Sequence, residues 1–240
     1  AKKSIPGPAP GNYITMARAA QAARDIVGDT VFGSQGLVMA HGTGTPQNRT
    51  TESAIMSTVA KAMGVSDWRV SAIKSHTGHS LGAAGGDQLS ALLGVWDSGW
   101  IPGIGTIETV AADVETDRLN FLLDNAPTNQ CAYSLVNSKG FGGNNATAAV
   151  VSPAVSHSLL KGLHGGRALD TWQARFEATQ QRRQDIEDAR LSGDWQPLYR
   201  FNDGVLDDSD IEAKVGKLKL GDVEISTNDR LMPSDWLLET

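Results

Sequence analysis

Two histidines and a lysine lie in or beside glycine-rich turns of this sequence. His41 begins the run His-Gly-Thr-Gly-Thr, and Lys74 and His79 belong to the run Lys-Ser-His-Thr-Gly-His-Ser-Leu-Gly-Ala-Ala-Gly-Gly at residues 74–86. Neutral imidazoles can polarise a thioester or ketone oxygen through their N–H groups, and a nearby ammonium disfavours their protonation. These three side chains therefore predict carbonyl chemistry in which negative charge develops on an oxygen.

A third glycine-rich run, Asn-Ser-Lys-Gly-Phe-Gly-Gly-Asn-Asn, occupies residues 137–145. Glycine lets a substrate approach the backbone, and successive N–H groups can bind a developing oxyanion. His41 follows the short apolar run Leu37–Ala40, and ligands of open α/β sheets bind at the carboxyl ends of strands. We therefore expect the three turns to form most of one wall of an active site.

The elements that position these turns are predicted from apolar and small residues. Thr50 or Thr51 is a candidate N-cap of the helix that Gly64 ends, and the small residues Gly85 and Gly86 predict a helix that packs closely. Short apolar runs predict strands, and apolar residues at helical spacing predict helices. The predicted strands are residues 37–40, 70–73, 131–137 and 146–151, and the predicted helices are residues 13–27, 50–63 and 80–96.

Composition predicts a globular α/β protein and disfavours several classes of partner. The 240 residues are 40% hydrophobic and include 26 glycines, and the formal net charge of −6 comes without a basic cluster for nucleic acid. A single cysteine, Cys131, cannot form an internal disulfide, which suits the reducing cytoplasm. No run approaches the roughly 20 apolar residues of a membrane span, and residues 1–11 lack the apolar core of a signal peptide.

The character of the sequence changes after Pro153, which predicts two domains, 1–153 and 154–240. Residues 167–191 form a charged amphipathic pattern typical of a long helix, and a strand is possible at residues 217–225. We interpret the second region as a C-terminal extension, and its pattern assigns it no role.

The residues alone leave three other interpretations open. His41, His76 and His79 could be zinc ligands, although no cysteine or carboxylate stands at ligand spacing and a lysine is close in sequence. The glycine-rich turns could bind phosphate, although none has the G-x-x-x-x-G-K-[ST] pattern. The histidines could also be hydrogen-bonded core residues in tight turns.

In order and spacing, the three runs resemble the C-terminal half of a β-ketoacyl-acyl-carrier-protein synthase, over residues 5–152. The resemblance implies a thiolase-like α/β fold with layers α-β-α-β-α, of which this chain would hold the C-terminal half only. It also implies an acyltransferase that loads an acyl group on a cysteine, decarboxylates a malonyl thioester and joins the two by Claisen condensation. The nucleophilic cysteine of that family lies in the N-terminal half, so Cys131 is expected to be a buried small hydrophobe.

Residue roles follow from the same resemblance. His41 and His79 would hold the malonyl thioester oxygen and stabilise the enolate, and Lys74 would tune the charge of the site. Glu52 would lie near Lys74 in a buried ion pair. The remaining implied residues are Thr43 and Thr45 for the pantetheine amides, Phe141 as the gating side chain, and Gly140, Gly142 and Gly143 as the neighbours that let it move.

Two positions depart from the family pattern. Lys139 stands where the gating turn usually has a second phenylalanine, and a charge beside the acyl entrance favours short or unusual acyl groups over long apolar chains. His76 stands where an apolar residue is common, and a structural role is favoured over a functional one.

The resemblance also implies partners and substrates. We expect a cysteine-bearing N-terminal half, as a separate or cleaved chain, and a homodimer of the assembled enzyme. Substrates would be thioesters of acyl-carrier-protein phosphopantetheine or coenzyme A, with no resident cofactor or metal. Two alternatives stay open: a non-catalytic partner like the chain-length-determining subunits, which usually lack both histidines, and a thiolase-type degradative enzyme.

Overall fold

The structure is a computed structural model of the chain, and it describes residues 10–128, 130–140, 143–196, 201 and 203–228. Contacts divide the chain into two compact units, residues 1–174 and residues 175–240. The domain boundary predicted at residue 153 falls at the start of helix α6 (Pro153–His164), which groups with the first unit.

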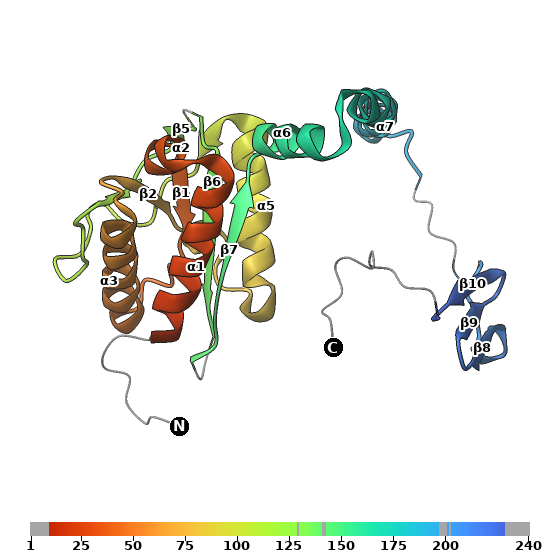
Figure 1. The fold of residues 1–240 in the computed structure, drawn as a ribbon, viewed down its shortest axis with the longest axis horizontal. Helices are drawn as coiled ribbons and strands as arrows, with labels where there is room; N and C mark the ends of the chain where they lie inside the picture. The colour runs from red at the N-terminus through yellow and green to blue at the C-terminus, as the bar shows by residue number, and fades with distance from the viewer. Residues whose placement is uncertain (1–9, 129, 141–142, 197–200, 202, 229–240) are drawn as a thin grey trace. The chain divides into compact units, whose positions relative to one another are not determined.

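A five-stranded sheet forms the centre of the first unit (Figure 1). Its strands lie in the order β4-β2-β1-β6-β7. All neighbouring pairs are parallel except β6 and β7, which are antiparallel. The strands are β1 (Gly36–Met39), β2 (Trp68–Ser71), β4 (Leu119–Phe121), β6 (Tyr133–Lys139) and β7 (Asn145–Val151). The four predicted core strands are thereby confirmed, each within a few residues.

Helices cover both faces of this sheet, which gives three layers (Figure 1). Successive side chains of a strand point to opposite faces. Val38 and Ala40 accordingly pack with residues of helices α1 (Pro10–Val27) and α3 (Pro46–Met63). Leu37 and Met39 pack with Leu92 and Val95 of α5 (Ala84–Ser98) on the other face.

Helix α3 begins earlier than predicted. Its first residue is Pro46 and its N-cap residue is Thr45. Proline suits this position because the first N–H of a helix has no intrahelical partner. Thr50 and Thr51 lie one turn inside, and their hydroxyls donate to carbonyl oxygens of the preceding turn at 3.0 and 2.7 Å. The predicted cap was wrong because a threonine hydroxyl can bond back along a helix as well as cap it.

The other predicted helices of this unit are confirmed with altered ends. Gly64 ends α3 in the left-handed conformation, at φ 75°. A single 3₁₀ turn, η1 (Leu81–Ala83), precedes α5, so the helix predicted from residue 80 becomes regular at Ala84. The remaining elements are α2 (Asp29–Ser34), α4 (Lys74–Thr77), β3 (Trp100–Ile101) and β5 (Ala126–Pro127).

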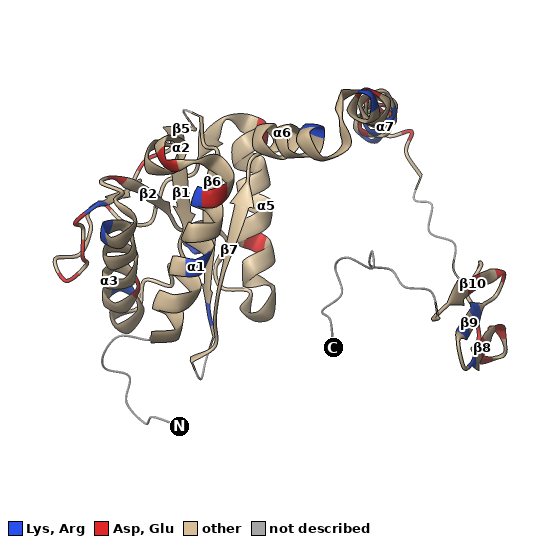
Figure 2. Cartoon of the chain, in the orientation of Figure 1, with Lys and Arg blue, Asp and Glu red and all other residues tan. Residues whose placement is uncertain are grey.

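The C-terminal region contains a long helix and a small antiparallel sheet. The predicted helix is α7 (Gly166–Ser192), and acidic and basic residues are interspersed along it (Figure 2). A 3₁₀ turn, η3 (Asp208–Asp210), leads into β8 (Ile211–Lys214), β9 (Lys217–Leu220) and β10 (Val223–Ser226). The predicted strand at 217–225 is two strands, because Gly221 turns the chain at φ 56°. Among the described residues, no helix is long and apolar enough to cross a bilayer.

Candidate active site

His41 lies at the carboxyl end of β1, where two strand ends meet closely. The N–H of Ala40 donates to the Ser71 carbonyl at 2.9 Å, which joins the end of β1 to β2. Gly42 has φ 54°, and a Cβ there would lie 2.5 Å from the Cβ of Ala72. Only glycine fits both the left-handed backbone and the narrow gap. The turn at residues 41–45 therefore depends on Gly42 for its path.

The carboxylate of Glu52 holds the backbone of this turn. Glu52 is 2% exposed, and the N–H groups of His41 and Gly42 donate to Oε1 at 2.7 Å and Oε2 at 3.0 Å. The amides of Asn48 and Asn137 donate to Oε2 at 2.8 Å and Oε1 at 2.7 Å. A buried carboxylate is costly unless donors compensate it, and these four N–H groups do so. Glu52 thus fixes the peptide that carries the first imidazole.

The two predicted histidines come together, and each has one ring nitrogen occupied by the backbone. The rings lie edge to face, with centroids 5.2 Å apart and planes at 81°. Nδ1 of His41 accepts from the N–H of Lys139 at 3.3 Å, and Nδ1 of His79 accepts from the N–H of Leu81 at 3.0 Å. An imidazole that accepts at Nδ1 carries its proton on Nε2. Both rings are therefore set to donate from Nε2–H.

The surroundings of His41 keep its imidazole neutral. Its pKa falls from 6.5 to about 4, mainly because burial disfavours the charged ring. The positive charge of Lys74 lowers the pKa further, as do smaller contributions from His79 and Lys139, whereas Glu52 raises it. A neutral His41 at physiological pH is a hydrogen-bond donor that adds no charge of its own.

Lys74 lies close to these groups, but the predicted ion pair with Glu52 is not formed. Among the described residues, Lys74 Nζ is buried without a hydrogen-bond partner, and no salt bridge joins it to Glu52. Burial lowers the pKa of Lys74, while the charges of Glu52 and Asp87 act in the opposite direction. The prediction of direct contact was wrong because backbone and amide N–H groups already occupy both oxygens of Glu52.

Two cavities meet at His79. One of about 470 Å³ is lined by Thr43, Lys74 and His79 together with apolar side chains of residues 104–114. The other, of about 500 Å³, is lined by His41, His79 and Lys139 with apolar residues of α5 and β7. The hydroxyls of Thr43 and Thr45, the predicted pantetheine ligands, lie 3.3 Å apart. The first cavity thus combines hydroxyl groups with the cation and one imidazole.

The predicted gating turn is described only in part. Gly140 follows β6 and lines the second cavity, and its N–H donates to the Asn144 carbonyl at 2.7 Å. Gly143 has φ 86°. Phe141 and Gly142 lie outside the described residues, so the gating role stays a prediction.

His76 bonds to the backbone, away from the paired histidines. Its Nε2 lies 2.7 Å from the carbonyl oxygen of Gly103, and a carbonyl only accepts, so Nε2 donates. Within the described part of the chain, no group of three histidine, cysteine or acidic side chains is placed to hold a metal ion. The contact of His76 therefore ties α4 to the loop that follows β3.

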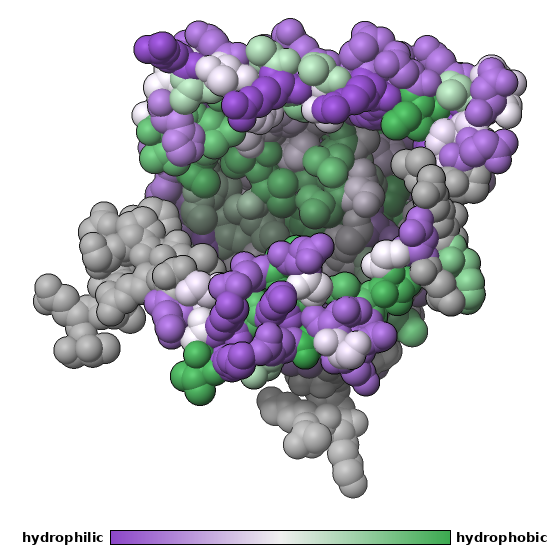
Figure 3. Space-filling view, turned by 90° about the vertical axis from the view of Figure 1, so that its right-hand side faces the viewer, coloured by the Kyte–Doolittle hydropathy of each residue, from purple (hydrophilic) through white to green (hydrophobic). Residues whose placement is uncertain are grey.

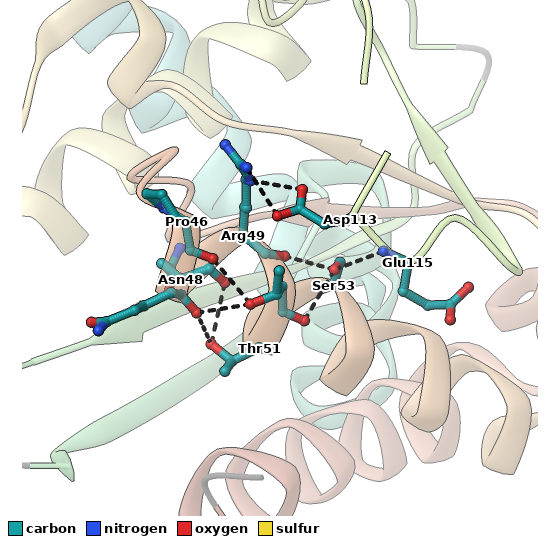
Figure 4. Close-up of polar contacts among 9 residues, drawn as sticks. Pro46, Asn48, Arg49, Thr51, Ser53, Asp113 and Glu115 are labelled. Atoms are coloured by element: carbon teal, nitrogen blue, oxygen red, sulfur yellow. Dashed lines mark hydrogen bonds and ion pairs between the residues drawn. The ribbon is translucent and has the colours of Figure 1, made fainter. Parts of the chain in front are cut away.

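The loop that walls the first cavity is tied to α3 at two points (Figure 4). Arg49 forms a bidentate pair with Asp113, with both N···O distances 2.9 Å. The N–H of Glu115 donates to Ser53 Oγ at 3.0 Å. The hydrogen bond from Arg49 lowers the pKa of Asp113. These contacts hold residues 104–114 over the cavity.

Two buried amides were not predicted as site residues. Gln88 of α5 is fully buried, and its Nε2 donates to the carbonyls of Met39, Ala40 and Asn137 at 2.8 to 3.1 Å. It thereby joins the ends of β1 and β6. A sequence signal exists, because Gln88 is the one polar member of the stripe that α5 buries, residues 84, 88, 92 and 95. The amide of Asn137 bonds Glu52, as described above.

Cys131 is buried, as predicted. It lies in the core cluster on the α5 side of the sheet, 5% exposed. Burial raises the pKa of its thiol, which disfavours the thiolate that a nucleophile needs.

Comparisons with known proteins agree with this geometry. Residues 3–108 match the family described as beta-ketoacyl synthase, C-terminal domain. The chain is 40% identical over 216 residues to the beta-ketoacyl-[acyl-carrier-protein] synthase FabY of Pseudomonas aeruginosa, which covers 88% of this chain and 34% of that protein. It is 40% identical over 131 residues to the 3-oxoacyl-[acyl-carrier-protein] synthase 2 of Staphylococcus aureus, which covers 54% of this chain and 31% of that protein.

A solved structure gives the same result. The crystal structure of the noncanonical ketosynthase FabY from P. aeruginosa matches with a TM-score of 0.86 and 37% identity, over 99% of this chain and 38% of that chain. The 216 residues aligned with the Pseudomonas protein exceed the 153 of the predicted first domain, so that likeness includes part of the C-terminal extension. The chain spans about a third of the length of these relatives.

The predicted fold class and family are thus confirmed. The three layers of the first unit correspond to the C-terminal half of the predicted five-layer arrangement. The chain belongs to the β-ketoacyl-acyl-carrier-protein synthases and comprises the C-terminal half of their thiolase-like α/β fold, followed by a C-terminal extension.

Proposed function

We infer that this chain supplies the enolate-stabilising part of an active site for decarboxylative Claisen condensation. One observation carries the inference: neighbouring turns present two imidazoles whose Nδ1 atoms are both occupied by backbone N–H groups. Both Nε2–H groups are left to donate to one developing oxyanion. Removing a single donor of this kind typically costs about 3 kcal/mol of transition-state stabilisation.

The reaction assigns a clear task to His41 and His79. As carbon dioxide leaves a malonyl thioester, the electrons of the broken carbon–carbon bond move onto the thioester oxygen and form an enolate. The two N–H groups bind that oxygen. The enolate carbon then attacks the carbonyl of a cysteine-bound acyl group, and the cysteine leaves as a thiolate. Lys74 Nζ is buried, and its positive charge disfavours protonation of His41 throughout.

A phosphopantetheine thioester fits the first cavity. Thr43 lines this cavity and its hydroxyl lies 3.3 Å from that of Thr45, so we propose that both hydroxyls bond the amides of a pantetheine arm. The curated relatives are named for acyl-carrier-protein substrates, so we propose acyl carrier protein as the donor, with coenzyme A thioesters as the other possible carrier.

The exposed apolar side of α5 is the evidence for a partner that supplies the nucleophilic cysteine. Leu89 and Leu93 of α5 are 41% and 55% exposed, and apolar residues gather on the face that Figure 3 turns toward the viewer. We predicted close packing at Gly85 and Gly86, but a Cβ at Gly86 would meet no atom within 4 Å and one at Gly85 only Ser138 Oγ at 3.6 Å. Among the described residues no atom packs against Gly86, so the close packing of this helix stays a prediction.

We therefore propose that a cysteine-bearing N-terminal region covers α5. It belongs either to the same polypeptide or to a separate chain, and the assembled enzyme forms a homodimer. Its cysteine would stand opposite the two Nε2–H groups.

The test follows both half-reactions in the complete polypeptide or assembly that contains this chain. Carboxyl-labelled malonyl thioester reports carbon dioxide release, and product mass reports condensation. His41→Ala and His79→Ala should each slow release by 10²- to 10³-fold. His157→Ala, on the exposed surface of α6, is the matched control and should leave both rates unchanged.

Two outcomes would replace the proposal. If condensation persists fully in His41→Ala, the chain is better explained as a chain-length-determining partner whose histidines are not catalytic. Condensation without any carbon dioxide release would favour a thiolase-type enzyme.

A further inference from the structure

Lys139 contacts the His41 imidazole through its backbone. It is the last residue of β6 and pairs with Asn145 of β7. Its N–H donates to His41 Nδ1 at 3.3 Å. Because this bond decides which ring nitrogen carries the proton, the end of β6 must stay in place for Nε2 to remain the donor.

The side chain of Lys139 has a separate anchor on α3. Nζ donates to Thr51 Oγ1 at 3.1 Å. Figure 4 shows that the Thr51 hydroxyl bonds back along α3, and it donates its proton to the Gln47 carbonyl at 2.7 Å. Its oxygen can therefore accept from the Lys139 ammonium without conflict. Thr51 precedes Glu52, whose carboxylate holds the N–H of His41. Two consecutive residues of α3 therefore hold the two partners of the His41–Lys139 hydrogen bond.

Ionisable side chains from three elements and one turn surround His41. Glu52 belongs to α3, Lys74 to α4 and Lys139 to β6, and His79 lies between α4 and η1. One carboxylate thus faces two ammonium groups. Protonation of His41 would add a third cation and would also remove the acceptor that the Lys139 N–H uses. Charge and hydrogen bonding favour the same neutral tautomer.

We propose that Lys139 is a positioning residue for His41, and that its ammonium, anchored on Thr51, keeps its own peptide N–H against Nδ1 of the imidazole. The inference rests on the proposed role of His41 as an Nε2–H donor. It assigns a task to the lysine at the position where the family pattern has a phenylalanine. The side chain acts through the histidine and not on the substrate.

The experiment reads the tautomer of His41 directly. The complete polypeptide is labelled with ¹⁵N-histidine, and two-bond ¹H–¹⁵N spectra distinguish Nε2–H from Nδ1–H rings. Lys139→Met removes the ammonium and keeps the stem, and Thr51→Val removes the hydroxyl and keeps the shape. Thr51→Ser keeps the hydroxyl and is the matched control. Lys139→Met and Thr51→Val should move a measurable fraction of His41 to the Nδ1–H form, and Thr51→Ser should not.

Kinetics separate positioning from direct binding. If Lys139 positions His41, kcat for carbon dioxide release should fall about tenfold in both Lys139→Met and Thr51→Val with KM for malonyl thioester unchanged. A His41 tautomer that stays wild type in both variants would overturn the inference, as would a rise in KM alone, which would indicate an ammonium that binds the malonyl carboxylate. If Lys139→Met does not fold, Thr51→Val decides. The spectra need no turnover, so a failure of the proposed reaction would leave this result readable.

Discussion

The rings of His41 and His79 lie edge to face, with 5.2 Å between their centroids, although the two residues are 38 positions apart in the chain. The backbone N–H of Lys139 donates to Nδ1 of His41, and that of Leu81 donates to Nδ1 of His79. The donors of the site are thus set by main chain, and main chain changes little when the bound species changes. Such fixed donors cost little reorganisation during a reaction.

The pH dependence of malonyl decarboxylation should follow His41. Its pKa of about 4 lies below the usual 6.5, so the folded protein keeps His41 neutral until the pH approaches 4. The acid limb of kcat/KM should therefore lie near pH 4. The unfolded chain binds this proton near pH 6.5, so the His41 contribution to stability should fall as pH drops from 6.5 to 4. Lys74→Met should move the limb upward, because the Lys74 charge lowers this pKa. A wild-type limb near pH 6.5 would contradict the assignment.

Alanine at Gly42 should be far more damaging than alanine at Gly44. Both residues have positive φ, 54° and 70°, and left-handed backbone costs alanine about 1 kcal/mol. Only at Gly42 would the new Cβ meet another atom, the Cβ of Ala72 at 2.5 Å. We expect Gly42→Ala to lower the free energy of unfolding of the complete polypeptide by about 3 kcal/mol and Gly44→Ala by about 1 kcal/mol. Equal losses in denaturant titrations would show that the gap beside Gly42 opens freely.

Glutamine at position 52 should destabilise the protein despite its similar shape. The Glu52 oxygens accept from four N–H groups, and an amide would turn one oxygen into an NH₂ that faces donors. We expect the free energy of unfolding to fall by about 3 kcal/mol, measured by chemical denaturation of the complete polypeptide. Glu108→Gln, on an exposed loop, is the control and should stay within about 0.5 kcal/mol. An unchanged free energy of unfolding in Glu52→Gln would show that these four hydrogen bonds do not stabilise the turn.

A charge on the outer side of α5 tests the proposed partner. Leu93 is 55% exposed in this chain, but a covering N-terminal region would bury it. Leu93→Asp should then destabilise the complete polypeptide by about 3 kcal/mol or more, whereas Leu191→Asp, at a side chain 86% exposed on α7, should not. Residues 1–240 produced alone should be insoluble or molten. A cooperative thermal transition for that fragment, with Leu93→Asp neutral, would remove the case for a covering region.

Local sequence patterns predicted much of this structure, and long-range hydrogen bonds account for what they missed. Apolar runs indicated the strands, and the turns at His41 and His79 came together because parallel strands end at one edge of a sheet. The predicted Glu52–Lys74 ion pair was wrong because residue spacing in a sequence does not show that N–H groups already occupy the carboxylate. Gln88 was missed because its carbonyl partners are 48 or more positions away in the chain. The predicted start of α3 was wrong because threonine occurs both as an N-cap and inside helices.

Gln88 and Leu89 are adjacent on α5, and one faces the strand ends while the other faces outward. The Gln88 amide thus connects α5 to the peptide preceding His41 and to Asn137, where the third glycine-rich run begins. A region that binds the outer side of α5 contacts the same helix that carries Gln88. If the proposed partner binds there, we expect its docking and the orientation of the two histidines to depend on each other through Gln88.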